Sequence, residues 1–362
     1  MTKNKKTIVF FNGFYLPHLG GVERYTAGLI SGLKDDYNIC VVTSNVPDGD
    51  VYTTNDGIEM FRLPTWKMLR ERFPIIKKNS TYKNIVRQLK DKNIDHIIIN
   101  TRYYGTTILG LRLAREKHIV PILIDHSSDY ILKPYEIIQN RRVMKYSPNI
   151  YAVSECTSKW LKRINIKTKG VFYNSVNKRD DFVKKVNKTT KIIYAGRLLE
   201  EKGVNLLVDA YDKLKNKYNV SLEIIGDGPL YKDIKEKHQD VILTGTLSHE
   251  KTLKEMEKAD IFVFPTLYPE GFPTVILEAA MQKCAIISTD RGGIKELITD
   301  DDIGMILKND ASDLTEKLES LLKDPEKIRK YGEKAFKKTN EKFTWDRTIK
   351  TIKEELRKYE NN

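Results

Sequence analysis

Two glutamates, Glu270 and Glu278, stand eight positions apart in this chain and are the pair best suited to ligand chemistry. An apolar run, 261–265, precedes them, and a Gly-Phe-Pro turn follows the first glutamate. This order predicts a buried strand, a loop and a helix. The open amides of the helix start would attract a phosphate, between one carboxylate that reaches a sugar and another that reaches a ribose. The residues of this turn and helix start are Gly271, Phe272, Pro273, Thr274 and Val275.

Pro273 is expected in the first turn of that helix, where the missing N–H of proline removes no hydrogen bond. Glu278 would then lie about a turn and a half into the helix. A less specific interpretation fits the same spacing, with Glu270 as a carboxylate near a helix start and Glu278 as a solvated helix residue. The choice between the two interpretations depends on companion motifs.

A second segment combines glycines with cations directly after a predicted strand. Arg197 and Lys202 lie between Gly196 and Gly203. Gly196 allows a tight exit from the strand, and Gly203 lets the next helix begin close by. Ligands of parallel α/β sheets bind at the carboxyl ends of the strands, so both cations are placed to bind phosphate, arginine as a fork and lysine as a point charge. An ordinary charged surface loop is the alternative.

Glycine turns and one histidine end several other predicted strands. Gly20 and Gly21 follow the first strand, and paired glycines leave backbone amides open to an anion. Gly226 lies in a similar strand-end turn, and Leu247 follows the next strand. His126 ends a strand in the first half, although a single histidine is more often structural. Each of these signals is weak by itself.

Short β-branched runs alternate with amphipathic helical patterns along the whole chain, which predicts parallel sheets covered by helices on both faces. The polar, strand-free residues 178–190 indicate an interdomain linker. The predicted fold is therefore α/β with two Rossmann-like domains, 1–178 and 179–343, and a last helix in 344–362 that is a candidate to cross back to the first domain. The predicted strands are residues 7–12, 39–44, 58–63, 96–100, 121–125, 150–154, 170–174, 191–195, 221–226, 241–244, 260–265, 285–289 and 305–307.

The Glu-x7-Glu spacing of Glu270 and Glu278, together with the loop that carries Arg197 and Lys202, resembles the retaining family 4 glycosyltransferases of the bacterial cell-surface polysaccharide type. The resemblance covers nearly the whole chain and implies the GT-B fold, in which two Rossmann-like domains face a central cleft. It also implies that Glu270 contacts the donor sugar and Glu278 the nucleotide ribose. By the same resemblance Arg197 and Lys202 bind the diphosphate.

This resemblance assigns roles to the weaker motifs as well. The loop of Gly20 and Gly21 would close on the donor phosphates, and Gly226 would lie near the base and the phosphates. The backbone around Leu247 would meet the base. His126 would touch the donor sugar or help to stabilise the transition state.

The chain has 362 residues, 40% of them hydrophobic, and a formal net charge of +14. This length fits two domains of ordinary size, and no apolar run approaches the ~20 residues of a membrane helix. The excess of positive charge lies in residues 1–178, where 29 lysines and arginines face 15 acidic residues, whereas the remainder has 34 of each. The charge concentrates in 60–92, with ten basic and two acidic residues.

The basic segment 60–92 also contains interleaved aromatic and aliphatic residues, which suits an anionic membrane surface. A solvated region in a lysine-rich protein is an alternative. Nucleic acid or another acidic polymer is a third alternative, but no nucleic-acid-binding motif occurs, so no nucleic-acid partner is expected.

Three cysteines without metal-ligand or redox spacing fit a reducing cytoplasm. The expected location is cytoplasmic, peripheral at the inner face of the plasma membrane.

The expected activity is that of a retaining glycosyltransferase that moves a hexosyl or N-acetylhexosaminyl unit from a nucleotide-diphosphate sugar. The acceptor would be lipid-linked or a polysaccharide in cell-envelope synthesis, such as that of a capsule. No metal and no cofactor are expected, because Arg197, Lys202 and the helix-start amides would stabilise the leaving diphosphate. A UDP-sugar is preferred as donor, since many cell-envelope sugars travel on UDP, and a GDP-sugar remains open.

Three other functions compete with this one. A GT-B nucleotide-sugar epimerase would not need both glutamates with Arg197 and Lys202. A non-catalytic, glycosyltransferase-like partner subunit usually loses the cationic pair or a glutamate, and none of these residues is missing here. A nicotinamide-dependent enzyme would carry a Gly-x-Gly-x-x-Gly fingerprint after a strand, and the chain has none there. The sugar, the base, the acceptor and the oligomeric state are not specified by the sequence.

Overall fold

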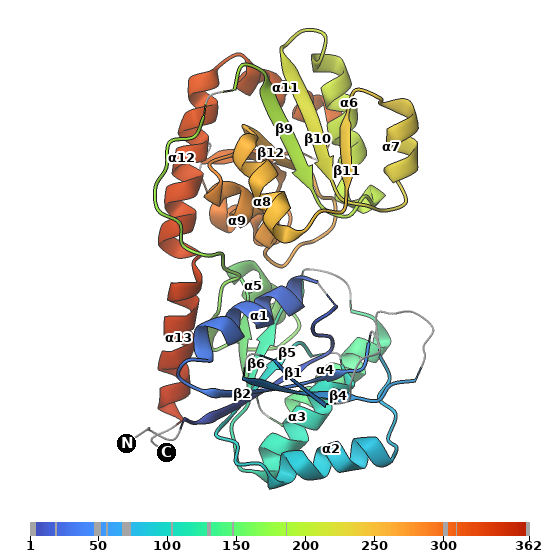
Figure 1. Ribbon diagram of the computed structural model, residues 1–362, viewed down its shortest axis with the longest axis vertical. Helices are drawn as coiled ribbons and strands as arrows, with labels where there is room; N and C mark the ends of the chain where they lie inside the picture. Colours follow the sequence, from blue (N-terminus) through green and yellow to red (C-terminus); the bar gives the residue numbers. More distant parts are fainter. Residues whose placement is uncertain are drawn as a thin grey trace. The chain divides into compact units, whose positions relative to one another are not determined.

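The chain forms two compact units in a computed structural model (Figure 1). The N-terminal unit contains residues 1–174 and 345–362, and the C-terminal unit contains 175–344. The division thus falls after Asn174, a few residues before the expected boundary at 178, and the last helix groups with the N-terminal unit. The structure describes residues 5–18, 20–46, 52–55, 57–66, 74–102, 104–128, 132–146, 148–185, 187–299, 303–308 and 310–359.

The N-terminal unit is built on an eight-stranded sheet of order β3-β4-β2-β1-β5-β6-β7-β8. Its strand pairs are parallel, except that β3 runs antiparallel to β4. The strand order reverses between β1 and β5, which makes this pair the topological switch point of the unit. The strands are β1 (Thr7–Asn12), β2 (Asn38–Ser44), β3 (Tyr52–Asn55), β4 (Ile58–Leu63), β5 (His96–Asn100), β6 (Ile122–Asp125), β7 (Asn149–Ala152) and β8 (Gly170–Val171).

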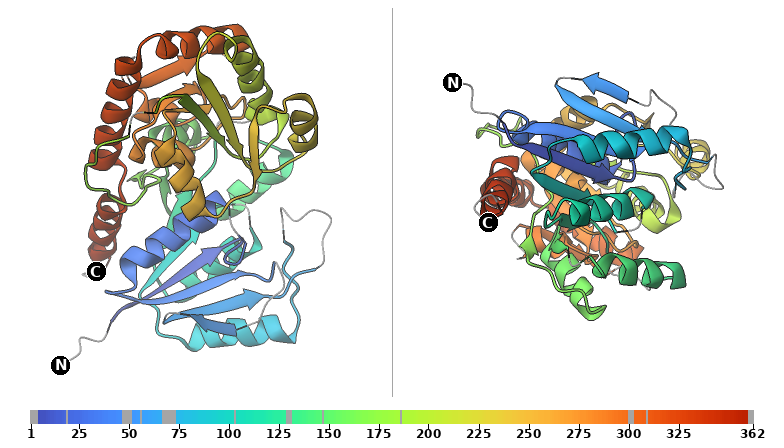
Figure 2. Two further views of the ribbon diagram at one scale, coloured as in Figure 1. Left: turned by 45° about the horizontal axis from the view of Figure 1, so that its top comes forward. Right: turned by 90° about the horizontal axis from the view of Figure 1, so that it is seen from below.

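Alternate residues of the inner strands enter two cores on opposite faces of this sheet. In β1, Val9 belongs to one buried cluster and Ile8 to the other. The last helix packs beside α1 in the second cluster, where a Cβ on Gly28 would meet the ring of Trp345 at 2.1 Å (Figures 1 and 2). The helices are α1 (Gly21–Leu33), α2 (Ser80–Asp91), α3 (Gly105–Glu116), α4 (Pro134–Met144), α5 (Glu155–Arg163) and α13 (Trp345–Lys358).

The C-terminal unit has a six-stranded sheet of order β11-β10-β9-β12-β13-β14 whose strand pairs are all parallel. The chain runs outward from β9 to β11 and then returns to β12, so the switch point lies between β9 and β12. The strands are β9 (Thr190–Ala195), β10 (Val220–Ile225), β11 (Ile242–Gly245), β12 (Ile261–Phe264), β13 (Ala285–Thr289) and β14 (Gly304–Leu307).

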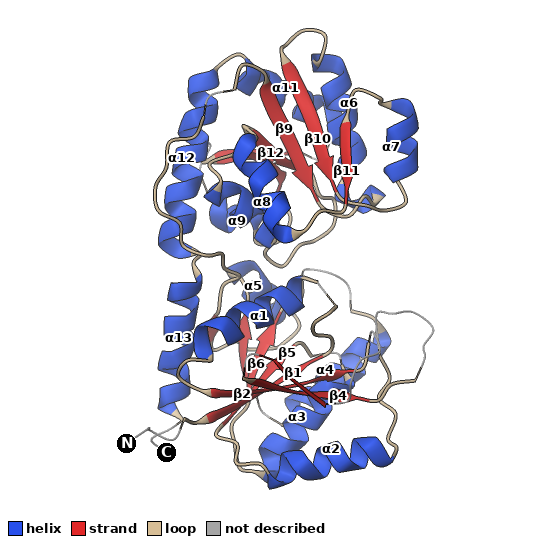
Figure 3. Ribbon diagram, viewed as in Figure 1, coloured by secondary structure: helices blue, strands red, loops and turns tan. Residues whose placement is uncertain are grey.

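Helices lie on both faces of this second sheet (Figure 3). They are the short 3-10 helix η1 (Glu200–Lys202), α6 (Val204–Leu214), α7 (Tyr231–Lys237), α8 (His249–Lys258), α9 (Thr274–Met281), α10 (Ile294–Leu297), α11 (Ala311–Leu322) and α12 (Pro325–Lys342).

The predicted α/β fold of two Rossmann-like domains is confirmed. Strand β3 was not predicted. Within the described residues, every helix is too short or too polar to span a bilayer.

Candidate functional site

The loops after β9 and β12, which flank the switch point of the C-terminal unit, bring a lysine and a glutamate together. Lys202 Nζ donates to Oε1 of Glu270 at 2.6 Å. Thr266 Oγ1 donates to the same oxygen at 3.2 Å. Both charged side chains are largely buried, with 11% of Lys202 and 16% of Glu270 exposed. Two residues that the sequence assigned to phosphate and to sugar therefore form one charged pair at the carboxyl edge of the sheet.

Two glycines allow the site loops to approach each other. Gly203 has φ +67°, and a Cβ there would lie 2.1 Å from the carbonyl oxygen of Pro265. Gly292 has φ +65°, and a Cβ there would lie 1.4 Å from the carbonyl oxygen of Glu270. Only glycine combines a left-handed backbone with this contact. The Gly292 turn therefore packs directly against the backbone of the Glu270 loop, and Gly293 N–H adds a hydrogen bond of 2.9 Å to Gly271 O.

The strand-end turn of Gly226 joins two neighbouring loops. Its φ is +142°, and a Cβ would lie 1.9 Å from the carbonyl oxygen of Gly196. The Gly226 N–H donates to Gly245 O at 2.9 Å. The turns after β9, β10 and β11 are thus connected through glycine backbones, so Gly226 shapes this edge without a side chain.

Arg197 is exposed and forms no ion pair within the part of the chain that the structure describes. Its carbonyl oxygen accepts a hydrogen bond from the Tyr194 hydroxyl at 3.0 Å, which holds the loop against the sheet. Burial raises the pKa of that hydroxyl, which therefore stays protonated and able to donate. The guanidinium is then a cation on a fixed backbone, with its donors available to a phosphate.

Helix α9 begins one residue later than expected. Pro273 has φ −70° and ψ 116°, so it is the N-cap and does not lie inside the first turn. Thr274 and Val275 are the first helical residues, and no side chain hydrogen-bonds to cap this start. Phe272 is buried and packs edge-to-face on Phe343, so its side chain holds the loop in place. The helix start is left to interact with an anion through its amides.

Glu278 is paired with a residue that the sequence did not indicate. Its Oε1 lies 2.9 Å from Nε2 of His249, the first residue of α8. The carboxyl side chain is 9% exposed and the imidazole 49% exposed. The interpretation of Glu278 as a solvated helix residue is wrong, because the carboxylate is buried. A histidine directly after the helix-capping Ser248 was the available signal.

In the N-terminal unit, a buried carboxylate lies beside the glycine loop before α1. Glu23 is buried, and a Cβ on Gly20 would lie 2.4 Å from its carboxyl oxygen, whereas Gly21 has open space. Burial raises the pKa of this group, against the opposing effects of nearby backbone amides and of His18 at 3.5 Å. A phosphate beside Gly20 would therefore meet the Glu23 carboxyl group.

His126 lies directly after β6, and its Nε2 is buried without a hydrogen-bond partner among the described residues. Its ring packs edge-to-face with the ring of Tyr25, with 4.8 Å between the two ring centroids. Burial lowers the pKa of His126 to about 4, so the imidazole is neutral near pH 7. Any hydrogen bond that it gives to a sugar would therefore come from a neutral ring.

A buried charged network, also absent from the sequence analysis, supports the turn that carries His126. Arg102 is fully buried and pairs with Asp125, the residue before His126. The Arg102 guanidinium also donates to Asn140 at 2.7 Å and to Ser127 at 3.1 Å. Asp125 accepts from the Ser127 N–H at 2.9 Å, so the strand-end turn is hydrogen-bonded on both sides of the histidine.

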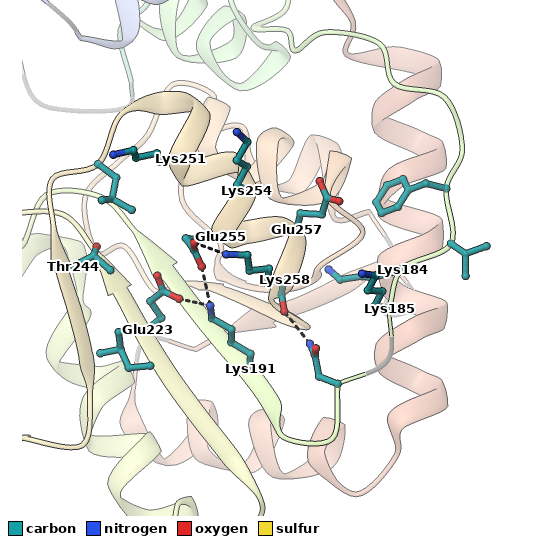
Figure 4. A pocket seen from close by; sticks show the side chains of 15 residues that line it. Lys184, Lys185, Lys191, Glu223, Thr244, Lys251, Lys254, Glu255, Glu257 and Lys258 are labelled. Carbon is teal, nitrogen blue, oxygen red and sulfur yellow. Dashed lines mark hydrogen bonds and ion pairs between the residues drawn. The ribbon is translucent and has the colours of Figure 1, made fainter.

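A groove of about 1000 Å³ lies elsewhere on the C-terminal unit, beside α8 and strands β10 and β11 (Figure 4). Lys191 lies inside it and bonds to Glu223 and to Glu255, the latter at 3.1 Å. Of the predicted site residues, Leu247 alone lines this groove. The groove is therefore separate from the pair of Lys202 and Glu270. No cluster of three or more metal-ligand side chains occurs in the described ranges.

Both units match models of glycosyltransferase families. The model of glycosyl transferases group 1 matches residues 176–338, and the model of glycosyltransferase family 4 matches residues 19–178. An uncharacterized glycosyltransferase of Methanocaldococcus jannaschii is 27% identical over 358 residues, which cover 95% of this chain and 96% of the relative. The GPI3 subunit of a phosphatidylinositol N-acetylglucosaminyltransferase from Saccharomyces cerevisiae is 27% identical over 331 residues, covering 84% and 72%.

Solved structures share the fold. Sucrose-phosphate synthase from Thermosynechococcus elongatus superimposes with a TM-score of 0.77 at 15% identity and covers 98% of this chain and 99% of its own. Anabaena HepE in complex with UDP gives a TM-score of 0.74 at 17% identity, with 98% and 100% covered. The two family models together cover most of the chain, and the chain is a glycosyltransferase of the GT-B type.

Proposed function

We propose that this GT-B glycosyltransferase transfers a hexosyl or N-acetylhexosaminyl unit from a nucleotide-diphosphate sugar with retention of the anomeric configuration and without a metal ion. The observation that carries the proposal is the pair of Lys202 and Glu270 at the switch point, beside Arg197 and the uncapped start of α9. This edge offers cations and amides to a diphosphate and a carboxylate to a sugar.

In the proposed arrangement Glu270 hydrogen-bonds sugar hydroxyls, and Glu278 hydrogen-bonds the ribose. Arg197, Lys202 and the amides of Thr274 and Val275 contact the diphosphate. The bond between sugar C1 and the diphosphate oxygen breaks while C1 bonds to the acceptor oxygen on the same face. The acceptor proton passes to the leaving diphosphate, so no side chain needs to act as nucleophile. Fixed positive groups stabilise the negative charge that develops on the diphosphate.

UDP is the preferred nucleotide. Anabaena HepE, which shares the fold, has been solved with UDP and with UDP-glucose, and this supports a UDP-sugar donor for the present chain. A GDP-sugar remains the second candidate.

The yeast relative belongs by name to a phosphatidylinositol N-acetylglucosaminyltransferase, which supports an N-acetylhexosaminyl unit and a lipid acceptor. The proposed acceptor is lipid-linked or a polysaccharide of the cell envelope.

The proposed location is the inner face of the plasma membrane, through the basic segment 60–92. Trp66 and Ile75 in this segment are each more than half exposed, and Trp66 N–H donates to Ile75 O at 3.0 Å. Lys77 lies 4.8 Å over the Trp66 ring. Exposed apolar side chains next to lysines are typical of a membrane-surface contact. Residues 67–73 of the segment lie outside the described residues.

Vesicle binding tests this location. Lys77 and Lys78 are changed to glutamine together, and sedimentation with anionic phosphatidylserine vesicles is compared with neutral vesicles. We expect weaker binding to anionic vesicles only, because each lysine near the surface contributes about 1 kcal/mol. A double change of Lys213 and Lys217 to glutamine in the C-terminal unit is the control. Unchanged binding of the first variant would contradict the proposed surface.

Turnover tests the chemistry. UDP- and GDP-linked glucose and N-acetylglucosamine are incubated with lipid-linked acceptors, with and without EDTA, and nucleotide release is compared with sugar transfer. We expect transfer from one UDP-sugar, unaffected by EDTA, and NMR coupling of the product that shows the donor configuration. Inversion or a strict metal requirement would refute the proposed mechanism. Conversion of the donor without acceptor would favour the alternative of a nucleotide-sugar epimerase.

The second candidate is a non-catalytic, glycosyltransferase-like partner subunit. The name of the yeast relative, a subunit of a larger transferase, favours it. The presence of Arg197, Lys202, Glu270 and Glu278 in one unit favours catalysis instead. Nucleotide binding without any transfer to any acceptor would support the subunit function.

A further inference from the structure

We propose that His249 is a positioning residue for Glu278, which it holds in the orientation that receives the ribose of the nucleotide sugar. This inference rests on the proposed function, because it takes Glu278 as a contact to the nucleotide. It adds a residue from a second helix, α8, to the donor site. The contact of 2.9 Å between His249 Nε2 and Glu278 Oε1 is its starting point.

The Glu278 carboxylate needs such a partner because it is largely removed from water. Only 9% of its side chain is exposed, and the neighbours Leu277 and Ala279 in α9 are fully buried. A buried carboxylate is costly unless hydrogen bonds or an opposite charge compensate it. The imidazole supplies a donor to Oε1 in its Nε2-protonated form, and a charge as well when both nitrogens are protonated.

The backbone directs His249 toward α9. It is the first residue of α8, and the side chain of the preceding Ser248 accepts the N–H of Lys251 at 3.3 Å, which caps the helix. Lys251 stands two residues later and lines the groove of Figure 4. Residues two apart on a helix point to nearly opposite sides. The histidine therefore lies on the side of α8 that packs against α9, away from the groove.

The two partners are unequally exposed to solvent. The imidazole is 49% exposed and the carboxylate 9%, so a ligand approaching from solvent meets the histidine side of the pair. Ribose hydroxyls are donors, and a carboxylate can accept several hydrogen bonds at once. A carboxylate that is already held in place loses less conformational freedom when the ligand binds, and this raises affinity.

The chain offers a matched control in the same unit. His238 Nδ1 lies 2.8 Å from Oδ2 of Asp212, so it is another histidine and carboxylate pair of similar length. This pair joins the end of α7 to α6, and neither residue belongs to the proposed donor site. Removal of His238 reports the general effect of breaking such a pair.

A double-mutant cycle tests the inference through the affinity for UDP, measured by titration calorimetry on the full chain. The variants are His249→Ala, Glu278→Ala, both together, His249→Gln and His238→Ala. We expect His249→Ala to weaken UDP binding about tenfold, which corresponds to loss of one hydrogen bond to a charged group. Glutamine places a side-chain amide donor near the Nε2 position and is expected to restore most of the affinity. His238→Ala is expected to bind UDP like the wild type.

The cycle separates a positioning role from a direct contact. If His249 acts through Glu278, its removal changes nothing further in the Glu278→Ala background. Equal UDP affinity of the wild type and His249→Ala would overturn the inference, provided that Glu278→Ala is weakened, and the proposed function would stand. An equal loss in both backgrounds would also overturn it, because the histidine would then touch the nucleotide itself. Full affinity of Glu278→Ala would instead contradict the donor site of the proposed function.

Kinetics supply a second readout. A positioning role in nucleotide binding predicts a raised donor KM for His249→Ala with kcat close to that of the wild type. A lowered kcat with an unchanged KM would contradict it. The melting temperatures of His249→Ala and His238→Ala are measured alongside, and we expect similar values. A large fall for His249→Ala alone, without rescue by glutamine, would indicate a purely structural contact.

Discussion

Lys202 Nζ lies 2.6 Å from Oε1 of Glu270, and the two residues are 68 positions apart in the chain. One follows β9 and the other follows β12, the strands between which the sheet order reverses. The pair thus joins the two halves of the second sheet where α/β proteins bind ligands. A diphosphate at this edge would meet an ammonium group whose position Glu270 already fixes.

Lys202→Ala should lower kcat by about 100- to 1,000-fold, the range found when one charge-stabilising donor is removed from a reacting group. The physical reason is the loss of a fixed cation next to the diphosphate as its charge develops. Initial rates at saturating donor measure the effect. Lys217→Ala, which breaks an exposed pair with Glu319, is the control and should retain full activity. A kcat for Lys202→Ala within threefold of the wild type would exclude Lys202 from the chemistry.

Gly292→Ala should disturb the Glu270 loop. Its φ is +65°, and the new Cβ would lie 1.4 Å from the Glu270 carbonyl oxygen, so the backbone of the loop must move. We expect a loss of several kcal/mol of stability or a clear loss of activity in a folded variant, measured by urea unfolding and by turnover. Gly57→Ala is the control, because Gly57 has φ +76° with nothing near its Cβ, and should lose only about 1 kcal/mol. Equal behaviour of the two variants would refute the close contact.

Arg102→Leu should destabilise the N-terminal unit by about 3–5 kcal/mol, because it leaves Asp125 as an uncompensated buried charge. The ion pair is buried on both sides, with 0% of Arg102 and 1% of Asp125 exposed. Lys92→Ala breaks the half-buried pair of Lys92 with Glu59 and should lose less than about 1 kcal/mol. Urea unfolding measures both variants. Comparable losses would show that the Arg102 network is not a special support of the His126 turn.

His126 should make stability depend on pH in a defined window. Burial lowers its pKa from 6.5 to about 4, so between these values the unfolded chain binds a proton that the folded chain does not. Stability should therefore fall as pH falls from about 6.5 to about 4, by at most about 1.4 kcal/mol per pH unit. His126→Asn should remove this slope, as measured by urea unfolding at several pH values. An identical dependence of stability on pH in both proteins would show that burial does not lower the pKa of His126.

Much of the fold follows from the sequence because parallel strands leave a clear pattern. Residues such as Ile97, Ile98 and Ile99 are buried on both sides of the sheet, which gives continuous apolar runs. Strand β3 was not predicted from the sequence because it is an antiparallel edge strand of polar residues. The Asp-Gly dipeptide before Ile58 is a hairpin signal and could have predicted it.

The site was less predictable than the fold, because side-chain partners depend on how distant segments pack. The loop motifs placed Lys202 and Glu270 at strand ends, but the sequence did not show that they touch. Glu278 and His249 are 29 positions apart, and their contact depends on the packing of α8 against α9. The approach of the Glu23 carboxyl group to Gly20 depends on local backbone geometry, which the sequence does not specify.

Binding of a nucleoside diphosphate through Glu278 should raise the melting temperature of the protein, which a thermal shift experiment measures. The protein is melted with UDP, GDP, ADP and dTDP at equal concentration, and the series is repeated on Glu278→Ala. A ligand at ~100 times its dissociation constant should add about 2.7 kcal/mol of stability. We expect a clear rise in melting temperature with UDP that the variant loses. No rise with any of the four nucleotides, or an equal rise in the variant, would contradict it.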